Sequence, residues 1–321
     1  MDRRQFLVGA AAGSFALAVD PRALAARLGG TPVAYVTADL ESHVVVLDLD
    51  WARVTRLIRT GPGPRSIESV HDRIAVVAHT EHGVVTLLDA ATSRIRAELD
   101  GFEAPRYTAV HPQLLLAYIT DSTSEEVVVL DAEHAKVLWR TRVPGPARHV
   151  SISRDGRMLW TALGTKAARV AVLDLSDPRR PKLVRTFTPP FLAHDVVFAP
   201  DGRTVWVTSG SERRLALFRD GRRPVRTLSV GTPPQHVTFA REKAFVASGD
   251  DGTVCRHRLD GELERDARVP LGSYNVTFGW NRLVTPSLGG GTVSLLDRNG
   301  RVTAIRTVAR AAHDACIVYG P

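Results

Sequence analysis

A short motif returns seven times along this chain of 321 residues, about once every 40 residues. Each copy places basic, amide or aromatic side chains just before a β-branched run, as in Pro64-Arg65-Ser66-Ile67 and Ala193-His194-Asp195-Val196. The second residues of the seven copies are 41, 42, 46, 41, 39 and 39 residues apart, and they are Arg65, Arg106, Arg148, His194, Gln235, Tyr274 and His313. A repeat of this length that is built from strands alone is typical of a β-propeller.

One repeat is predicted to contain four strands. In the first repeat we expect them at residues 33–37, 43–48, 54–59 and 66–70, with the third alternating polar and apolar as a half-exposed strand does. The second strand of most repeats ends in aspartate, which opens a turn by accepting hydrogen bonds from the backbone that follows. Because such hairpins cannot bury their faces alone, the fold class is predicted to be all-β, a seven-bladed propeller with four-stranded blades.

The two ends of the chain are expected to meet in one blade. The first blade lacks an innermost strand of its own at the N-terminus, and residues 313–319 form an unpaired apolar strand at the other end. We therefore predict that the C-terminal strand pairs into the first blade and closes the ring, so that deletion of residues 313–321 destabilises the whole fold.

The first 25 residues resemble an export signal rather than part of the fold. Arg3-Arg4-Gln5-Phe6-Leu7 is similar to a twin-arginine motif, residues 7–19 are apolar, and Ala23-Leu24-Ala25 offers a small-x-small cleavage site. We expect a signal peptide at 1–25, a short linker at 26–32 and the propeller at 33–321, with the mature protein exported from a bacterial cytoplasm to the periplasm or beyond. The apolar stretch is too short for a stable membrane span.

The composition limits the kinds of molecule that this protein is expected to bind. The formal charge is +8, but no basic run of five residues occurs and the arginines alternate with acids, so no nucleic-acid surface is expected. The two cysteines, Cys255 and Cys316, fall in blades that are not neighbours and are predicted to be unpaired and buried. No Cys/His spacing typical of zinc is present. We expect a monomer without a cofactor.

Several motifs resemble those of the YVTN-type seven-bladed propellers. Tyr35-Val36-Thr37-Ala38, Tyr118-Ile119-Thr120-Asp121 and Trp206-Val207-Thr208-Ser209 are similar to the motif that names this family, and Phe198-Ala199-Pro200-Asp201-Gly202 resembles its inter-strand turn. The resemblance covers residues 33–321. It implies the propeller fold, and it points to a group that includes periplasmic YncE-like proteins, lactone-hydrolysing propellers and propellers fused to redox or surface proteins.

The repeat also aligns one set of side chains around the channel mouth. In blade order the ring reads His313, Arg65, Arg106, Arg148, His194, Gln235 and Tyr274, and the next residues inward read Asp314, Ser66, Tyr107, His149, Asp195, His236 and Asn275. Three adjacent blades therefore give arginine, which suits bidentate capture of a carboxylate or phosphate. The ligand-binding set predicted from this ring is Arg65, Arg106, Arg148, His149, His194, His236, Tyr274 and His313.

Each of these residues also has a purely structural interpretation. Three neighbouring guanidinium groups repel one another unless an acidic group neutralises their charge. Residues around the channel mouth can also form hydrogen bonds to the next blade without binding a ligand. The pairs His194-Asp195 and His313-Asp314 are the catalytic candidates if the protein is a hydrolase. No metal site is predicted, because adjacent side chains on one strand point to opposite faces and cannot clamp one ion together. Channel carboxylates for calcium are sparse as well.

These features of the sequence are compatible with three functions. The first is an exported, non-enzymatic propeller that binds an anionic small molecule or an acidic segment of an envelope protein. The second is a lactonase-like hydrolase that acts through the channel histidines and aspartates. The third is a scaffold for protein interactions in the cell envelope.

Overall fold

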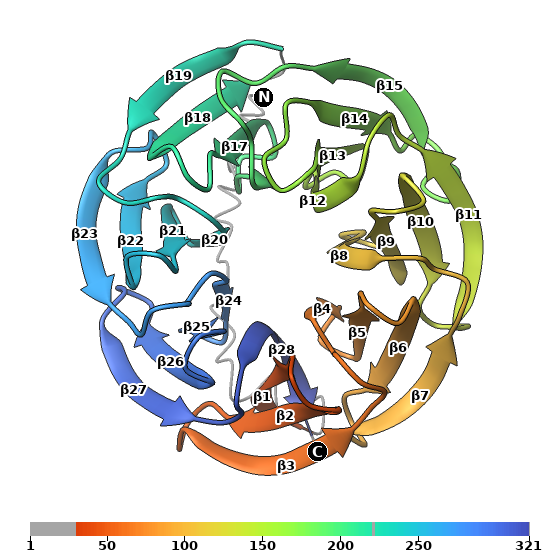
Figure 1. Ribbon diagram of the computed structural model, residues 1–321, viewed down its shortest axis with the longest axis vertical. Coiled ribbons are helices and arrows are strands. Elements are labelled where there is room, and N and C mark those ends of the chain that lie inside the picture. Colours follow the sequence, from red (N-terminus) through yellow and green to blue (C-terminus); the bar gives the residue numbers. More distant parts are fainter. Residues whose placement is uncertain (1–29, 220–221, 321) are drawn as a thin grey trace, which may run out of the picture.

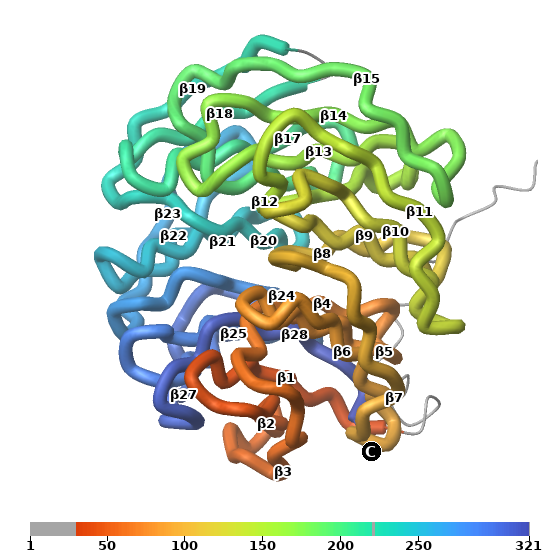
Figure 2. The backbone as a smooth tube through the Cα atoms, turned by 45° about the vertical axis from the view of Figure 1, so that its right-hand side comes forward, coloured from red at the N-terminus to blue at the C-terminus, as the bar shows by residue number. Residues whose placement is uncertain are grey.

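The computed structural model describes residues 30–219 and 222–320. Within them the chain forms seven four-stranded antiparallel sheets arranged in a ring around a central channel (Figure 1). The tube view shows the innermost strands packed around this channel (Figure 2). The predicted fold class is confirmed. The described residues contain no helix that is both long and apolar enough to cross a bilayer.

Each blade is numbered here by its order in the chain, and blade 1 includes the last strand. Blade 1 consists of β28 (Ala312–Gly320), β1 (Thr31–Ala38), β2 (His43–Asp48) and β3 (Arg53–Arg59). Blade 2 consists of β4 (Ser66–Val70), β5 (Ile74–His79), β6 (Val84–Asp89) and β7 (Arg94–Leu99). Blade 3 consists of β8 (Pro105–Val110), β9 (Leu116–Asp121), β10 (Glu126–Asp131) and β11 (Lys136–Arg142). Blade 4 consists of β12 (Ala147–Ile152), β13 (Met158–Leu163), β14 (Val170–Asp174) and β15 (Lys182–Phe187).

The remaining three blades follow the same order from the channel outward. Their strands are β16 (Val196–Phe198), β17 (Thr204–Thr208), β18 (Arg214–Arg219) and β19 (Pro224–Ser229); β20 (Val237–Ala240), β21 (Lys243–Ser248), β22 (Thr253–Arg258) and β23 (Leu263–Arg268); β24 (Thr277–Gly279), β25 (Arg282–Pro286), β26 (Thr292–Asp297) and β27 (Val302–Thr307). Strand β22 ends two residues before Asp260, which lies in the following turn, and the aspartate expected at the end of β18 lies outside the described residues.

The ring closes through the two ends of the described chain. Strand β28 pairs antiparallel with β1, in a register that joins Thr31 to Gly320 and Val36 to Ala315. The predicted closure is confirmed. Strand β1 begins at Thr31, so the last two residues of the predicted linker belong to the propeller, while the predicted signal peptide lies outside the described residues.

The core lies between the blades. Seven clusters of buried apolar side chains fill the seven interfaces between neighbouring sheets. Between blades 4 and 5, for example, Trp160 contacts Phe187 and Phe218 edge to face, with ring centroids 5.1 and 5.9 Å apart. Because every face is covered by the next blade, no single blade has a core of its own. Cys255 and Cys316 are both unpaired and buried, as predicted.

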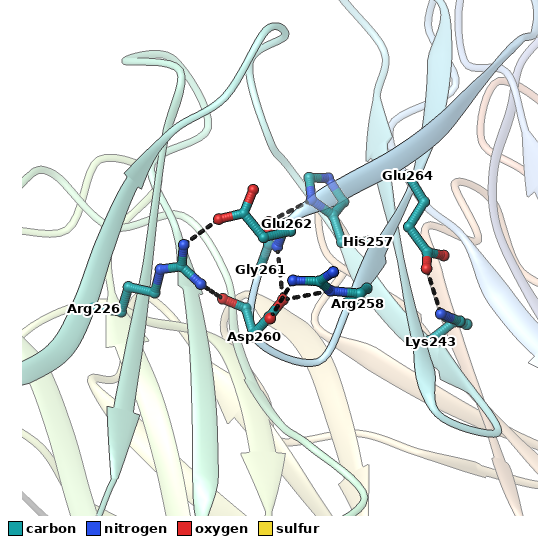
Figure 3. A network of polar contacts seen from close by, with 8 residues as sticks. All are labelled: Arg226, Lys243, His257, Arg258, Asp260, Gly261, Glu262 and Glu264. Atoms are coloured by element: carbon teal, nitrogen blue, oxygen red, sulfur yellow. Dashed lines mark hydrogen bonds and ion pairs between the residues drawn. The ribbon is translucent and has the colours of Figure 1, made fainter.

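Many of the arginine residues lie on the outermost strands of the blades. Strand β19 shows how these side chains are used: Arg226 reaches from blade 5 to blade 6, where it donates to the Asp260 carbonyl over 2.7 Å and pairs with Glu262 (Figure 3). Arg258 and Asp260 form a further pair at 2.7 Å. Exposed pairs of this kind add little stability. They lie on the outer rim, so these arginines supply no charge for a site in the channel.

Candidate functional site: the channel mouth

Two connected hollows occupy the channel. The outer one, the mouth cavity, has a volume of about 400 Å³ and is lined by six of the seven predicted ring residues, all except Arg106. The inner one, of about 360 Å³, is lined by six of the seven residues predicted one step inward, all except Ser66. Tyr107, His236 and Asn275 line both hollows and mark the junction between them.

Threonine hydroxyls of β1, β9 and β17 hold the mouth residues in place. Each of these strands lies beside the innermost strand of its blade. Thr37 donates to the carbonyl of Arg65 over 2.8 Å, and Thr120 and Thr208 donate to the carbonyls of Arg148 and Gln235, each over 2.7 Å. Each of these threonines is the third residue of its Tyr/Trp-Val/Ile-Thr motif. The repeated motif therefore does more than form a strand, since it fixes the backbone of the mouth residue in the next blade.

The three arginines do not share one environment. Arg65 forms an ion pair with Asp39 at 2.9 Å. Arg148 donates to the hydroxyl of Thr165, and its guanidinium lies 5.9 Å from the ring centroid of Tyr107. Neither Arg148 nor Arg106 has an ion pair within 4 Å among the described residues. The expected trio is thus one neutralised arginine and two without a counter-charge in contact.

Arg106 and Arg148 are also short of hydrogen bonds. The Nε atom of each is buried and has no partner among the described residues. Burial, and then the nearby charges of Arg148 and Arg65, lower the pKa of Arg106. Arg148 lines the mouth cavity, so an anion that enters it stabilises this guanidinium directly, whereas Arg106, outside the lining, gains only through longer-range Coulomb attraction.

Three histidines from consecutive blades meet at the junction of the two hollows. One ring nitrogen from each of His149, His194 and His236 lies within 4.8 Å of the other two. The Nε2 atoms of His149 and His236 are 3.2 Å apart. Tyr107 packs on His149 with ring centroids 4.1 Å apart, so this aromatic side chain covers one imidazole.

The Asp195 carboxylate orients one of these imidazoles. Its Oδ2 lies 3.4 Å from Nδ1 of His236, in the next blade. The backbone N–H groups of Val196 and Val237 donate to the same carboxylate over 2.8 and 3.2 Å and hold it in place. As expected, Asp195 and its neighbour His194 do not act on one point, because the aspartate pairs across the blade interface.

Burial keeps the remaining imidazoles neutral. It holds the pKa of His149 well below its usual range, with His194 and His236 adding to the effect, and it lowers the pKa of His194 to about 4. Both rings are therefore uncharged at pH 7 and present a lone pair at one nitrogen.

The second predicted His-Asp pair lies apart from this cluster. His313 donates from Nδ1 to the Arg65 carbonyl over 2.9 Å, and burial lowers its pKa to about 3. Asp314 accepts from the N–H groups of Ile67 and Ala315, and burial raises its pKa to about 6. Below it, burial raises the pKa of Glu68 to about 8, with Asp314 adding to the effect.

The sequence-based prediction did not include several residues at the mouth. Among them are Asp39, Thr165, Lys166 and Asp250, each of which follows the strand beside the innermost strand of its blade. Asp250 accepts from the hydroxyl of Tyr274 over 3.2 Å, so this tyrosine is anchored at the rim. Their position was the available signal, since the loops after these strands flank the channel in a propeller.

The sequence comparisons give two short likenesses. The chain is 30% identical over 112 residues to a 6-phosphogluconolactonase from Cronobacter sakazakii, which covers 32% of this chain and 33% of that protein. It is 25% identical over 171 residues to a 6-phosphogluconolactonase from Enterobacter sp. strain 638, which covers 49% of each chain. The matched part thus spans half or less of these curated relatives. No family model matches the chain.

Solved structures share the fold over most of the chain. A functionally unknown protein from Desulfotomaculum acetoxidans superposes with a TM-score of 0.77 at 13% identity, covering 90% of this chain and 99% of that one. Hydrazine synthase from Kuenenia stuttgartiensis gives a TM-score of 0.63 at 20% identity over 76% and 79% of the two chains. The dihydro-heme d1 dehydrogenase NirN gives 0.64 at 15% identity over 86% and 63%. The chain is a seven-bladed β-propeller. Identities this low show the fold alone.

Proposed function

We propose that this propeller binds an anionic small molecule in the mouth cavity. The observation that carries the proposal is the pair Arg106 and Arg148, whose buried Nε atoms lack partners and whose charges no acid contacts within 4 Å among the described residues. Arg148 lines the mouth cavity, and Arg106 lies outside its lining but near enough for the charge of Arg148 to lower its pKa. Leaving two such groups together costs stability unless a ligand supplies the missing charge and acceptors. A carboxylate or phosphate provides both, and guanidinium groups bind these anions in a bidentate manner.

The rest of the mouth cavity suits a ligand of modest size. Its volume of about 400 Å³ falls within the range of small-molecule sites. Exposed Lys166 adds a third cation at the rim, while Ser209, Gln235 and Tyr274 offer neutral hydrogen-bonding groups. A compact sugar acid or sugar phosphate matches this combination of one charged end and several polar contacts.

Thermal shift with a set of anions tests this proposal. The set comprises inorganic phosphate, gluconate, 6-phosphogluconate and citrate, each titrated against the full chain. We expect at least one to raise the melting temperature saturably. The double variant Arg106→Ala/Arg148→Ala is expected to weaken its affinity about tenfold or more, since each charged hydrogen bond contributes about 1.5–3 kcal/mol.

The matched control removes two arginines from the outer strands. Arg56→Ala/Arg96→Ala makes the same change in net charge, and in the part of the chain that the structure describes these side chains donate to backbone carbonyls at the rim. We expect this control to bind as the unmodified protein does. A ligand whose shift survives the loss of Arg106 and Arg148 would show that the anion binds elsewhere.

A second candidate function, hydrolysis of an anionic lactone, is favoured by the pairing of His236 with Asp195. His236, oriented by this carboxylate, takes a proton from water as the water oxygen attacks the lactone carbonyl carbon. The ring C–O bond then breaks and the leaving oxygen takes the proton from the imidazolium. The likeness to two 6-phosphogluconolactonases supports such a substrate, whose phosphate would be held by the arginines.

Turnover separates the two candidates. Hydrolysis of 6-phosphogluconolactone above the spontaneous rate, reduced about 100-fold or more in His236→Gln, is expected if the protein is a lactonase. In the same assay Arg106→Ala/Arg148→Ala should raise KM more than it lowers kcat. Binding without turnover would leave the protein as a binding module.

A further inference from the structure

The three histidines at the junction have the composition of a metal site. His149, His194 and His236 come from blades 4, 5 and 6, and one nitrogen of each lies within 4.8 Å of the others. No metal site was predicted from the sequence for these three histidines, because in the channel only His-Asp neighbours on one strand and carboxylates that could bind calcium were considered. Imidazole nitrogens without carboxylate ligands favour zinc, cobalt, nickel or copper over calcium or magnesium.

Contacts around the rings fix their tautomers. Nδ1 of His194 lies 3.3 Å from the carbonyl of Thr165, and Nδ1 of His236 lies 3.4 Å from the Asp195 carboxylate. In both rings the proton therefore belongs on Nδ1, which leaves the Nε2 lone pair free. A carbonyl or carboxylate behind each ring is the usual outer arrangement of metal-binding histidines.

The separation of two of these nitrogens also fits. Two imidazole nitrogens bound at ~2.0–2.1 Å to one tetrahedral ion lie roughly 3.3–3.4 Å apart, and Nε2 of His149 and Nε2 of His236 are 3.2 Å apart. If both carry lone pairs, they repel at this distance unless a cation lies between them. The alternative is an N–H···N hydrogen bond donated by either ring. If His149 donates, its buried Nδ1 becomes an acceptor without a donor of good geometry among the described residues. If His236 donates while its Nδ1 proton faces Asp195, this ring is an imidazolium, and a bound metal ion takes the place of the Nε2 proton.

The surroundings hold the three rings in place. Tyr107 covers one face of His149, and two backbone N–H groups fix the Asp195 carboxylate that orients His236. Asp195 also offsets the positive charge that Arg148 brings to this part of the channel. His194 and His236 line the mouth cavity, so an ion held by the three rings remains reachable from outside.

We propose that His149, His194 and His236 bind one divalent transition-metal ion at the junction of the two channel hollows, with a further coordination position open toward the mouth cavity. Asp195 acts as a positioning residue for His236. This site does not use Arg106 or Arg148 and takes a different class of ligand, so the metal proposal and the anion proposal can fail separately. It is incompatible with His236 as a general base, because the metal ion would occupy the Nε2 lone pair that accepts the proton.

Cobalt(II) titration of the metal-stripped full chain tests the inference. We expect one equivalent of Co²⁺ to bind with the visible d–d absorption of a nitrogen-coordinated ion, and Zn²⁺ to displace it. His194→Ala and His236→Ala are each expected to weaken Co²⁺ binding at least 100-fold. Asp195→Asn should weaken it by about 10–100-fold while keeping the same spectrum.

The matched control is His134→Ala, which removes an exposed histidine in the turn between β10 and β11. Its Co²⁺ affinity and spectrum should equal those of the unmodified protein. Far-UV circular dichroism identifies any variant that fails to fold, and the unmodified chain alone then decides the question. A folded, stripped protein that binds no Co²⁺ saturably overturns the proposal, as does a spectrum that persists in both folded His194→Ala and His236→Ala.

Discussion

Blades 1 and 5 carry the same tripeptide, Ala-His-Asp, where their innermost strands enter the channel. In blade 5 the residues one step inward on the two adjacent blades are His149 and His236, and the tripeptide becomes part of a cluster of imidazoles. In blade 1 the corresponding neighbours are Asn275 and Ser66, and the ring of His313 donates to the backbone carbonyl of Arg65. An identical local sequence thus acquires different chemistry from the blades beside it.

The two aspartates differ for the same reason. Asp195 pairs with the imidazole of His236 at 3.4 Å, whereas Asp314 feels the charge of His236 without an ion pair to it, and burial dominates and raises its pKa. Asp195 adds to that rise, and the neighbouring Glu68 also has a raised pKa. The blade 5 side of the channel therefore offers lone pairs and one oriented carboxylate. The blade 1 side holds acids that burial keeps partly protonated near neutral pH.

The largest expected effect comes from removing the strand that makes blade 1 unusual. A chain that ends after Ala311 loses β28, including the buried residues Ala315 to Val318. The loss exposes apolar surface on both sides of the strand and opens the ring, which we expect to exceed the marginal ~5–15 kcal/mol stability of a typical domain. Calorimetry should show no cooperative transition above room temperature.

A peptide of residues 312–321 provides the control for that truncation. Added in excess, it should restore the transition, because the missing strand contributes pairing and burial but no covalent link. A truncated chain that melts at the original temperature would show that blade 1 does not depend on β28.

A smaller effect is expected from Glu68→Gln on the acidic side of the channel. The folded-state pKa of Glu68 is about 8 against an ordinary 4.5, so the folded protein holds its proton more tightly than the unfolded chain does. Stability from this group is complete below pH 4.5 and is lost as the pH rises through about 8. Glutamine does not titrate, so the variant should melt at least about 3 °C above the unmodified protein at pH 8.

The matched measurement for Glu68 uses pH and an exposed glutamate. At pH 4.5 the glutamine variant should show little advantage, and Glu133→Gln should show none at either pH. An equal gain for Glu68→Gln at both pH values would mean that the buried charge is not its cause.

The smallest expected effect concerns His313 on acidification. Its folded-state pKa of about 3 lies below the ordinary 6.5, so the stability it contributes is present above pH 6.5 and is lost as the pH falls toward 3. Asparagine keeps a donor for the Arg65 carbonyl but cannot take up a proton. Between pH 7 and pH 5 the melting temperature of His313→Asn should therefore fall about 2 °C less than that of the unmodified protein.

Exposed His82 supplies the comparison for His313. His82→Asn should follow the unmodified protein across the same pH range, because this residue is exposed to solvent. Parallel curves for His313→Asn and the unmodified protein would contradict the effect of burial on His313.

The fold was predictable because the propeller repeats one unit seven times. Equivalent residues could be aligned from the spacing alone, which placed Arg65, Arg148, His194 and His236 around one opening. Closure by β28 followed from counting strands. In each case the period of the sequence carries the information, since it fixes which strand each residue belongs to.

The contacts between blades were not predictable in the same way. Arg65 forms an ion pair with Asp39, a loop residue that was not among the aligned ring positions. Because Arg65 is neutralised in this way, the expected trio of free arginines is reduced to a pair. The approach of His149 to His236 spans the channel between blades that are not adjacent. Such distances depend on channel radius and side-chain rotamers, which a single sequence does not contain.

The register of β28 with β1 also has a mechanical consequence. Thr31 and Gly320, at opposite ends of the described chain, are direct partners in the same pair of strands. A force that pulls these two residues apart acts across the backbone hydrogen bonds one after another, as a zip opens, instead of shearing all of them at once. Tension on both termini should therefore peel β28 from blade 1 at low force, and the remaining six blades would then unravel from an open ring.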